Sequence, residues 1–423
     1  MSVTSQADLR VDGARLWARL AEMAQIGATV NGGCNRQALT DLDRQGRDLF
    51  VRWAQEAGCT ISIDQVGNVF ARRGGTHADA LPVMTGSHLD TQATGGKFDG
   101  VYGVLAGLEV LQTLHEASVE TVSPIEVVVW TNEEGCRFAP AMLGSGVVSG
   151  TYDLDFAYSR QDKDGLTFGD ELRRIGYLGT EAAAPRPAAA MFEAHIEQGP
   201  ILDRAGLPIG VVQGIQGAYW FDVTLTGASA HAGPTPMDMR RDPWRALTEI
   251  VQQTFALADE RAPWGRATFG DIKALPGARN TVPESLVLTV DIRHPESDVL
   301  EAMVGNLRRL VAERAAAHAI EARIEQVWYM PPTRFDEGLV NTIAKCAADL
   351  GLPAQEIVSG AGHDSLHTAQ YAPTAMIFVP CDKGVSHNES EAAKPEDLAA
   401  GANVLLHAIL ATANTISNNK VTS

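Results

Sequence analysis

The sequence is short of cysteine and of basic side chains. Its five cysteines stand singly, without a CxxC pair, so we expect no disulfide framework. Lys and Arg number 34 against 52 Asp and Glu, which gives a net charge of −18. This balance argues against a nucleic acid partner, which requires a basic surface, and against an anionic membrane surface.

Long hydrophobic runs are also missing. No apolar run reaches the roughly 18–20 residues that a membrane helix needs. The N-terminal segment has no basic stretch followed by an apolar one, so we expect no signal peptide. Scattered cysteines suit a reducing compartment. Together these absences predict a cytoplasmic protein without a membrane partner.

The chain is long enough for two domains. Its 423 residues exceed the roughly 250–300 residues at which a single core stops growing. Amphipathic helices are expected at 13–25 and 38–57, and a hairpin at 59–73. Strands and helices then alternate, at 81–89, 100–117, 124–134 and 188–197, and again at 373–380 and 394–415. This alternation predicts an α/β fold with a mixed, mostly parallel sheet.

The middle of the chain follows a different order. Helix patterns at 241–256 and 297–317 alternate with strand patterns at 217–227, 267–275, 284–293 and 319–329. The order β-α-β-β-α-β is that of a ferredoxin-like α+β unit. We therefore predict an inserted domain at 214–327 and a catalytic, metal-binding domain made of residues 1–213 and 328–423. A small sheet inserted beside a larger body creates a cleft of the kind that ligands occupy.

The stretch TGSHLDTQATGGKFDG, residues 85–100, gives the first indication of chemistry. It places His88 and Asp90 at the carboxyl end of a predicted strand and Asp99 just before the next helix. Ligands of open α/β sheets bind at this end of the strands, and the intervening glycines let the loop fold tightly. Imidazole and carboxylate are zinc-type ligands. Asp90 is placed to hold the His88 ring in one tautomer, as a catalytic residue that acts through its neighbour.

Other predicted strands end in similar residues. Glu133 and Glu134 close the strand at 124–134, His195 lies at the end of the next strand, and His387 follows the last strand. Adjacent residues of an extended segment point to opposite sides, so one glutamate can bind metal while the other holds a proton. Five ligands allow one carboxylate to bridge two ions ~3.5–4 Å apart. Singly, each such side chain is more often a surface or core residue, but four strand ends together favour a metal site.

These motifs together resemble those of a known family. The segments GSHLDT, GGKFDG, TNEEGCRF, EAHIEQGP, AHAGPTP and SHNE occur in this order. They are similar to the amidohydrolase branch of the M20 metallopeptidases, above all to N-carbamoyl-L-amino acid hydrolases and β-ureidopropionases, with allantoate amidohydrolases as near relatives. The resemblance covers nearly the whole chain.

The resemblance implies a cofactor and a role for each strand-end residue. It implies two divalent metal ions, zinc first, with manganese, cobalt or nickel as alternatives. The implied general base is Glu133, and the implied ligands are His88, Asp99 as the bridge, Glu134, His195 and His387. Peptidase branches commonly have a carboxylate where His195 stands, which favours the carbamoylase side. The inserted domain is implied to serve as a lid and as the surface of a homodimer.

The inserted domain also carries polar candidates. Taken alone, Arg293 is a solvated charge at a strand end, although its planar fork matches a carboxylate. The resemblance implies instead that Arg293 and Asn280 hold the substrate carboxylate. It implies that His231, from this subunit or from its partner, stabilises the developing oxyanion. Further substrate contacts implied for the catalytic domain are Gln198, Gly362 and His363.

The predicted function is that of a metal-dependent amidohydrolase. It would cleave the carbamoyl C–N bond of N-carbamoyl-β-alanine or an N-carbamoyl-L-amino acid to the amino acid, ammonia and carbon dioxide. The alternatives are an allantoate amidohydrolase and an M20 aminoacylase or dipeptidase. A serine hydrolase built on Ser229 lacks the G-x-S-x-G turn, and a metal-stabilised binding protein would not need Glu133. The choice between an α- and a β-amino acid, the side chain accepted and the native metal stay open.

Overall fold

The chain forms two compact units in the computed structural model, which describes residues 6–415. The large unit comprises Met1–Gly214 and Phe335–Ser423. The small unit comprises Ile215–Arg334. The small unit therefore interrupts the sequence of the large one.

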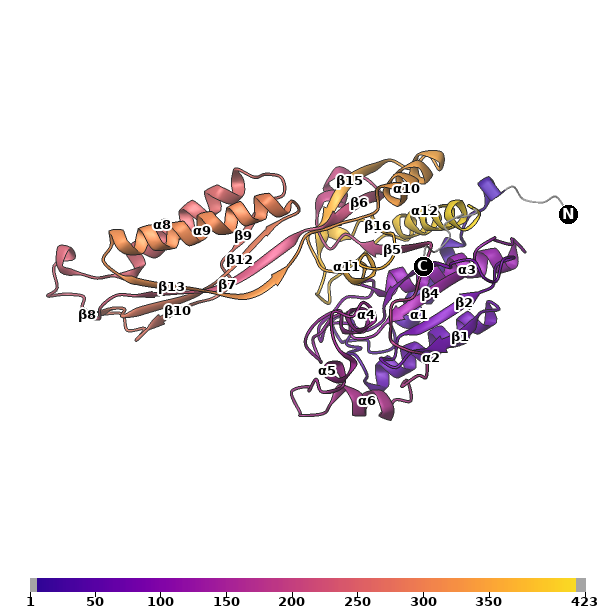
Figure 1. Ribbon diagram of the computed structural model, residues 1–423, viewed down its shortest axis with the longest axis horizontal. Coiled ribbons are helices and arrows are strands. Elements are labelled where there is room, and N and C mark those ends of the chain that lie inside the picture. Colours follow the sequence, from indigo (N-terminus) through magenta and orange to yellow (C-terminus); the bar gives the residue numbers. More distant parts are fainter. Residues whose placement is uncertain (1–5, 416–423) are drawn as a thin grey trace, which may run out of the picture. The chain divides into compact units, whose positions relative to one another are not determined.

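The large unit is built on a mixed sheet whose centre is parallel (Figure 1). The central strands lie in the order β4 (Ile125–Trp130), β3 (Val83–His88), β5 (Ala190–Ile196) and β16 (Thr374–Val379), and each neighbouring pair is parallel. Every residue of these four strands is buried, as expected of apolar strands that are covered on both faces. The predicted α/β fold with a mostly parallel central sheet is confirmed.

Antiparallel strands flank this centre on both sides. β2 (Val69–Arg73) pairs with β4 and forms a hairpin with β1 (Thr60–Ile63). On the other side β6 (Ile209–Ile215) runs antiparallel to β16, and β15 (Ala354–Ser359) pairs with β6. The sequence did not predict β6, because glycines interrupt its apolar pattern.

Two apolar helices pack against the parallel strands. α3 (Val101–Glu116) contacts β3, β4 and β5, and α12 (Pro395–Ala413) contacts β16 and β5. Most residues of both helices are buried, which explains why their sequences are apolar around the circumference. The remaining helices are α1 (Gly13–Met23), α2 (Asp41–Glu56), α4 (Leu143–Val148), α5 (Leu154–Tyr158), α6 (Phe168–Arg174), α7 (Ile201–Ala205), α10 (Glu337–Asp349) and α11 (Ser365–Thr368).

The small unit is a layer of two helices on an antiparallel sheet. Its main strands lie in the order β10 (Ile272–Leu275), β12 (Ser285–His294), β7 (Gly217–Thr226) and β13 (Glu321–Met330). α8 (Pro243–Asp259) and α9 (Ser297–Ala317) lie along one face of this sheet (Figure 1). Residues of β7 and β12 alternate between buried and more exposed positions, because one face of each strand packs on the helices. Short strands complete the unit: β8 (Ala230–His231), β9 (Arg266–Thr268) and β11 (Thr281–Val282). β14 (Thr333–Arg334) instead pairs with β6 as the last strand in the order of the large sheet.

Candidate metal centre

Neighbouring strands of the large unit place ionisable side chains at the same edge of the sheet. His88 is the last residue of β3, and His195 is the penultimate residue of β5. Glu133 and Glu134 follow β4, and His387 follows β16. Since β3, β4, β5 and β16 are parallel, their carboxyl ends meet at one edge. The side chains chosen from the sequence therefore lie in one region of the large unit.

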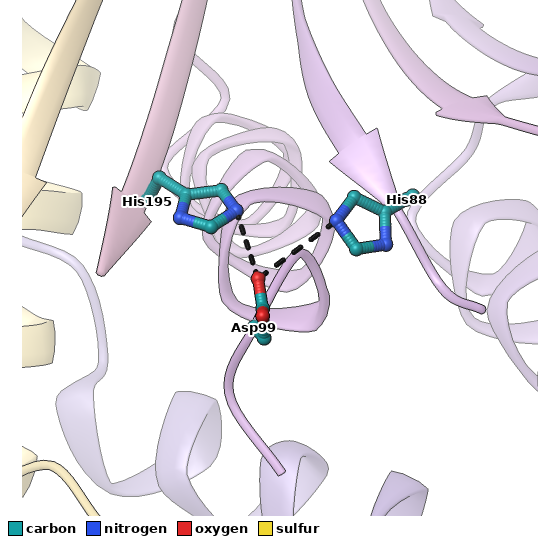
Figure 2. Close-up of side chains that lie close together, drawn as sticks. All are labelled: His88, Asp99 and His195. Carbon is teal, nitrogen blue, oxygen red and sulfur yellow. Dashed lines mark ion pairs between the residues drawn. The ribbon is translucent and has the colours of Figure 1, made fainter. Parts of the chain in front are cut away.

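The first group of possible ligands consists of His88, Asp99 and His195. One nitrogen or oxygen atom from each lies within 4.8 Å of the other two. Figure 2 shows both imidazole rings turned toward the Asp99 carboxylate. The Nε2 atoms of His195 and His88 lie 3.3 Å and 3.9 Å from Asp99 Oδ1. All three residues are buried.

Main-chain carbonyl groups fix the orientation of both rings. Nδ1 of His88 lies 2.9 Å from the carbonyl oxygen of Asp90. Nδ1 of His195 lies 2.9 Å from the carbonyl oxygen of Ile196. A carbonyl oxygen only accepts, so Nδ1 carries the proton in each ring. In the neutral rings, Nε2 is therefore left as the acceptor that a metal ligand requires, and in His195 it accepts the backbone N–H of Gly100 at 3.2 Å.

Asp90 has a different task from the one that its spacing suggested. Its carboxylate Oδ1 lies 4.0 Å from His88 Nδ1, too far for a hydrogen bond, and its main-chain carbonyl orients the ring instead. The Asp90 carboxylate accepts hydrogen bonds from the backbone N–H groups of Glu133 and Glu134, each at 3.2 Å. It therefore holds the turn after β4 in place. The two-residue spacing could not distinguish a carboxylate from a carbonyl acceptor.

Gly100 allows the Asp99 loop to approach β3. Its φ of 66° is in the left-handed region, where residues other than glycine are strained. A Cβ atom there would lie 2.3 Å from Cε1 and Nε2 of His88. The absence of a side chain at Gly100 thus lets Asp99 lie beside the end of β3.

The second group consists of Asp99, Glu134 and His387, so Asp99 belongs to both groups. His387 Nε2 lies 3.2 Å from Asp99 Oδ2 and 3.4 Å from Glu134 Oε2. Gln92 orients Glu134: its Nε2 donates to Oε2 at 2.7 Å, and its backbone N–H donates to Oε1 at 3.2 Å. No pattern in the sequence singled out Gln92.

Glu133 lies beside both groups without belonging to either. Its Oε2 is 3.5 Å from His88 Nε2. Burial, followed by the charges of Asp364 and Glu134, raises the pKa of Glu133 well above the ordinary value. Burial, followed by the charge of Asp99, raises the pKa of Glu134 to about 8. The two adjacent glutamates thus have different partners.

The histidines differ in their response to this acidic environment. Burial lowers the pKa of His88 to about 4. Burial also opposes the charged form of His195, but the hydrogen bond to Asp99 and the charge of that residue outweigh it and raise the pKa to about 9. A hydrogen bond to Asp99 likewise raises the pKa of His387 to about 9. Protonation of His195 and His387 thus supplies the positive charge that stabilises the buried carboxylate of Asp99.

The chemistry of the donor atoms fits divalent cations. Each group offers three nitrogen or oxygen ligands, and the two groups meet at one carboxylate. Imidazole and carboxylate are the ligands that zinc and similar metals use. The clustered side chains therefore suggest divalent metal binding.

A third group, made of Glu193, His195 and His363, satisfies the same distance limit. Its atoms already have partners in the protein. The Glu193 carboxylate accepts hydrogen bonds from the hydroxyl groups of Ser87 at 2.7 Å and Ser365 at 2.6 Å. His363 Nε2 lies 2.9 Å from Ser359 Oγ. We therefore assign this group to the surroundings that support His195. Glu193 was not selected from the sequence, although it lies on the same face of β5 as His195.

The other residues chosen from the large unit have mixed surroundings. Gln198 Nε2 donates to Asp99 Oδ2 at 3.0 Å, so Gln198 adjoins the groups. His363 is buried, and its ring centroid lies 4.5 Å from that of His195. Gly362 lies in the same loop, between β15 and α11. Glu197 is the residue after β5. Its carboxylate accepts hydrogen bonds from the backbone N–H groups of Ile201 and Leu202 and caps α7.

The small unit brings together two of its three candidates. His231 of β8 is paired in register with Thr281 of β11, and the backbone of Ala232 donates to the carbonyl of Asn280 at 2.8 Å. Arg293 lies near the far end of β12, opposite Ala218 of β7. Its Nε and Nη2 atoms donate to the Asp291 carboxylate at 2.9 Å and 2.7 Å. Arg293 is thus separated from Asn280 and His231 by nearly the whole length of β12.

Membrane-spanning helices are not found in the part of the chain that the structure describes. None of the helices within residues 6–415 is long and apolar enough to cross a bilayer.

Comparison with known proteins places the chain in a family. A model of peptidase family M20/M25/M40 matches residues 75–411. The chain is 48% identical to an N-carbamoyl-L-amino-acid amidohydrolase of Rhizobium meliloti over 407 residues, which is 96% of this chain and 98% of that protein. It is 34% identical to an allantoate amidohydrolase of Bacillus subtilis over 388 residues, 90% of this chain and 93% of that protein. A crystal structure of an amidase of the hydantoinase/carbamoylase family from Burkholderia multivorans matches with a TM-score of 0.94 at 53% identity, covering 96% of this chain and 99% of that one.

The chain belongs to peptidase family M20/M25/M40. Within that family it is an amidohydrolase, with relatives among the carbamoylases and the hydantoinase/carbamoylase amidases. The resemblance drawn from its motifs is confirmed.

Proposed function

We propose that this enzyme cleaves the carbamoyl C–N bond of N-carbamoyl-L-amino acids or of N-carbamoyl-β-alanine. The products are the amino acid, ammonia and carbon dioxide. The observation that carries the proposal is the pair of ligand groups that share Asp99, with Glu133 beside them. The choice of a carbamoyl substrate is supported by the name of the Rhizobium meliloti relative.

The proposed cofactor is a pair of divalent cations. His88, Asp99 and His195 would hold one ion, and Asp99, Glu134 and His387 the other. Zinc suits this mixture of nitrogen and oxygen donors, with manganese, cobalt and nickel as alternatives. When bound, the ions would polarise the carbamoyl oxygen and lower the pKa of a water molecule at the site.

Glu133 is proposed to move the proton. Its carboxylate accepts a proton from the attacking water and later donates it to the leaving nitrogen. A backbone hydrogen bond to Asp90 keeps Glu133 at the end of β4.

Substrate contacts are proposed for Arg293, Asn280, His231, Gln198, Gly362 and His363. The guanidinium of Arg293 offers a planar pair of donors for the substrate carboxylate. Its Nε and Nη2 atoms donate to the Asp291 carboxylate, and this pairing fixes the plane of the guanidinium. Gln198 is proposed to orient the carbamoyl group, and His231 to donate to its oxygen as negative charge develops.

The small unit is proposed to be a ferredoxin-like lid and the dimerisation domain of a homodimer. The strand order β10-β12-β7-β13 with two helices on one face supports this assignment. Arg293 lies eight residues from Ser285 along β12, which is about 26 Å at ~3.3 Å per residue. Asn280 and His231 lie beyond the Ser285 end. A small substrate cannot span that distance, which favours a second subunit as the source of His231 and Asn280.

The test is a panel of substrates assayed with several metals. Metal-free enzyme would be supplied with Zn²⁺, Mn²⁺, Co²⁺ or Ni²⁺ and given N-carbamoyl-L-amino acids, N-carbamoyl-β-alanine, allantoate and N-acyl-amino acids. We expect the highest kcat/KM on a carbamoyl-amino acid. A preference for N-acyl-amino acids would contradict the proposal and indicate an aminoacylase.

Allantoate hydrolysis is the second candidate. The Bacillus subtilis relative supports it by its name, at lower identity than the carbamoylase. Allantoate also carries a carboxylate and ureido C–N bonds, so the same donor groups suit both substrates. The ratio of kcat/KM values on the two substrates distinguishes the candidates.

A further inference from the structure

Glu391 is a buried carboxylate for which the proposed mechanism has no use. It lies four residues after His387 and is 1% exposed. Its Oε1 accepts the backbone N–H groups of Phe98 at 2.8 Å and Asp99 at 3.2 Å. Its Oε2 lies 3.1 Å from the hydroxyl oxygen of Ser386. A single side chain thus connects the segment that carries His387 with the loop that carries Asp99.

The loop backbone packs directly against this carboxylate. A Cβ atom at Gly96 would lie 2.0 Å from the carboxyl carbon of Glu391 and 2.1 Å from its Oε1. Real Cβ atoms do not approach other atoms so closely, so any larger residue at position 96 must displace the carboxylate. The Glu391 carboxylate can therefore occupy its place only if residue 96 is a glycine.

Both the backbone and the side chain of Asp99 are therefore held by hydrogen bonds. Glu391 accepts its backbone N–H, while Ser386 Oγ and Gln198 Nε2 each lie 3.0 Å from its Oδ2. Ser386 lies between the carboxylates of Glu391 and Asp99. Since Asp99 is the residue that both ligand groups share, a shift of its loop would disturb both groups at once.

We propose that Glu391 is a positioning residue that fixes Asp99 relative to His387 and thereby sets the metal affinity of both groups. The inference rests on the proposed two-metal function. A carboxylate suits this task because a charged oxygen accepts two backbone hydrogen bonds more strongly than a neutral one. Aspartate is one methylene shorter and cannot reach the same partners from the same backbone. Glutamine keeps the length and one acceptor oxygen but loses the charge.

The experiment titrates metal into stripped protein. Wild type, Glu391→Asp, Glu391→Gln and Gly96→Ala would be freed of metal and titrated calorimetrically with Zn²⁺. We expect Glu391→Asp and Gly96→Ala to bind both ions about 10- to 100-fold more weakly, and Glu391→Gln to be affected less. In the loaded enzymes we expect kcat to fall while KM stays within about twofold, because Asp99 is not proposed to contact the substrate.

Glu389→Gln is the matched control in the same segment. The Glu389 carboxylate accepts a hydrogen bond from the Asn31 side chain at 2.7 Å. We expect its metal affinity and kcat to equal those of the wild type. The absorption spectrum of the Co²⁺ form adds a direct signature: it should change in Glu391→Asp and remain unchanged in Glu389→Gln.

The outcomes separate this inference from the proposed function. A wild type that does not bind two ions defeats the two-metal function itself. A wild type that binds two ions, together with Glu391→Asp and Gly96→Ala variants of unchanged affinity and spectrum, overturns the role of Glu391 alone. A lowered melting temperature with unchanged metal affinity likewise overturns it, because Glu391 would then only stabilise the fold. If Glu391→Asp fails to fold, Ser386→Ala replaces it and must show the same loss of affinity.

Discussion

Asp99 Oδ2 and His387 Nε2 lie 3.2 Å apart, although the two residues are far apart in the sequence. Asp99 lies in the loop before α3, and His387 in the segment after β16. Because β3 and β16 both run parallel to β5, which lies between them, their following loops meet at one edge of the sheet. This meeting lets a single aspartate serve two ligand groups.

Replacement of Glu133 should remove turnover without removing metal. Glu133→Gln keeps the size of the side chain but cannot accept the proton, so we expect kcat to fall by about 10²- to 10⁴-fold. Metal content, measured by mass spectrometry, should stay that of the wild type. Glu197→Gln is the control, since Glu197 only caps α7. Near-normal kcat in Glu133→Gln would refute its role as the base.

Ligand substitutions should remove ions in a pattern that reveals the sharing of Asp99. His88→Ala removes a ligand from one group, and His387→Ala removes one from the other, so we expect each variant to lose one ion. Asp99→Ala should lose both ions. Metal-to-protein ratios after gel filtration test this pattern. An Asp99 variant that keeps one tight ion would contradict the bridging role.

Removal of metal by a chelator should abolish activity reversibly. Dialysis against a strong chelator leaves the donor groups intact, so we expect activity to return when Zn²⁺, Mn²⁺, Co²⁺ or Ni²⁺ is added. The melting temperature should rise on addition, because a ligand that binds only the folded state stabilises it. A serine hydrolase that uses Ser229 would keep its activity throughout, which makes this the decisive test between the two mechanisms.

The metal-free protein should lose stability as the pH rises from about 6.5 to about 8.5. The folded state raises the pKa values of His195 and His387 to about 9 and that of Glu134 to about 8. For each group the folded state binds more protons than the unfolded state in this range, so deprotonation opposes folding. The pKa of His88 is lowered to about 4 in the folded state, so His88 affects stability only at lower pH.

Melting temperatures of the metal-free and metal-loaded proteins across this pH range measure the effect. Bound cations replace the protons as the source of positive charge, so the loaded protein should show a weaker pH dependence. A metal-free protein that becomes more stable toward pH 8.5 would contradict this assignment of proton-binding groups.

Substitution of Arg293 should weaken binding of the substrate carboxylate. Arg293→Lys keeps the charge but loses the planar fork, and we expect KM to rise by about 10- to 100-fold. A substrate whose carboxylate is replaced by an amide should bind poorly to the wild type and show little further change in the variant. Arg323→Lys, on the exposed edge strand β13, serves as the control with unchanged KM.

The elements and the chemical class of the site could be predicted from residues that are close together in the chain. Apolar strands ending in His88, Glu133, Glu134 and His195 indicated a parallel sheet with ligands at its carboxyl edge, because strand period and residue type are local properties. The glycines before Asp99 likewise marked a tight loop. These signals depend only on neighbours in the chain, so they could be predicted without a structure.

The groups that support the ligands could be identified only after the chain had folded. Gln92 contacts Glu134, Glu193 contacts Ser87 and Ser365, and Glu391 contacts the backbone of the Asp99 loop. The ring of His88 is held by a main-chain carbonyl rather than by the Asp90 carboxylate that the spacing suggested. Such contacts join segments that are distant in the chain, and a buried carboxylate leaves no periodic pattern in the sequence. They exist because folding leaves each buried polar group only the partners that packing brings within hydrogen-bond distance.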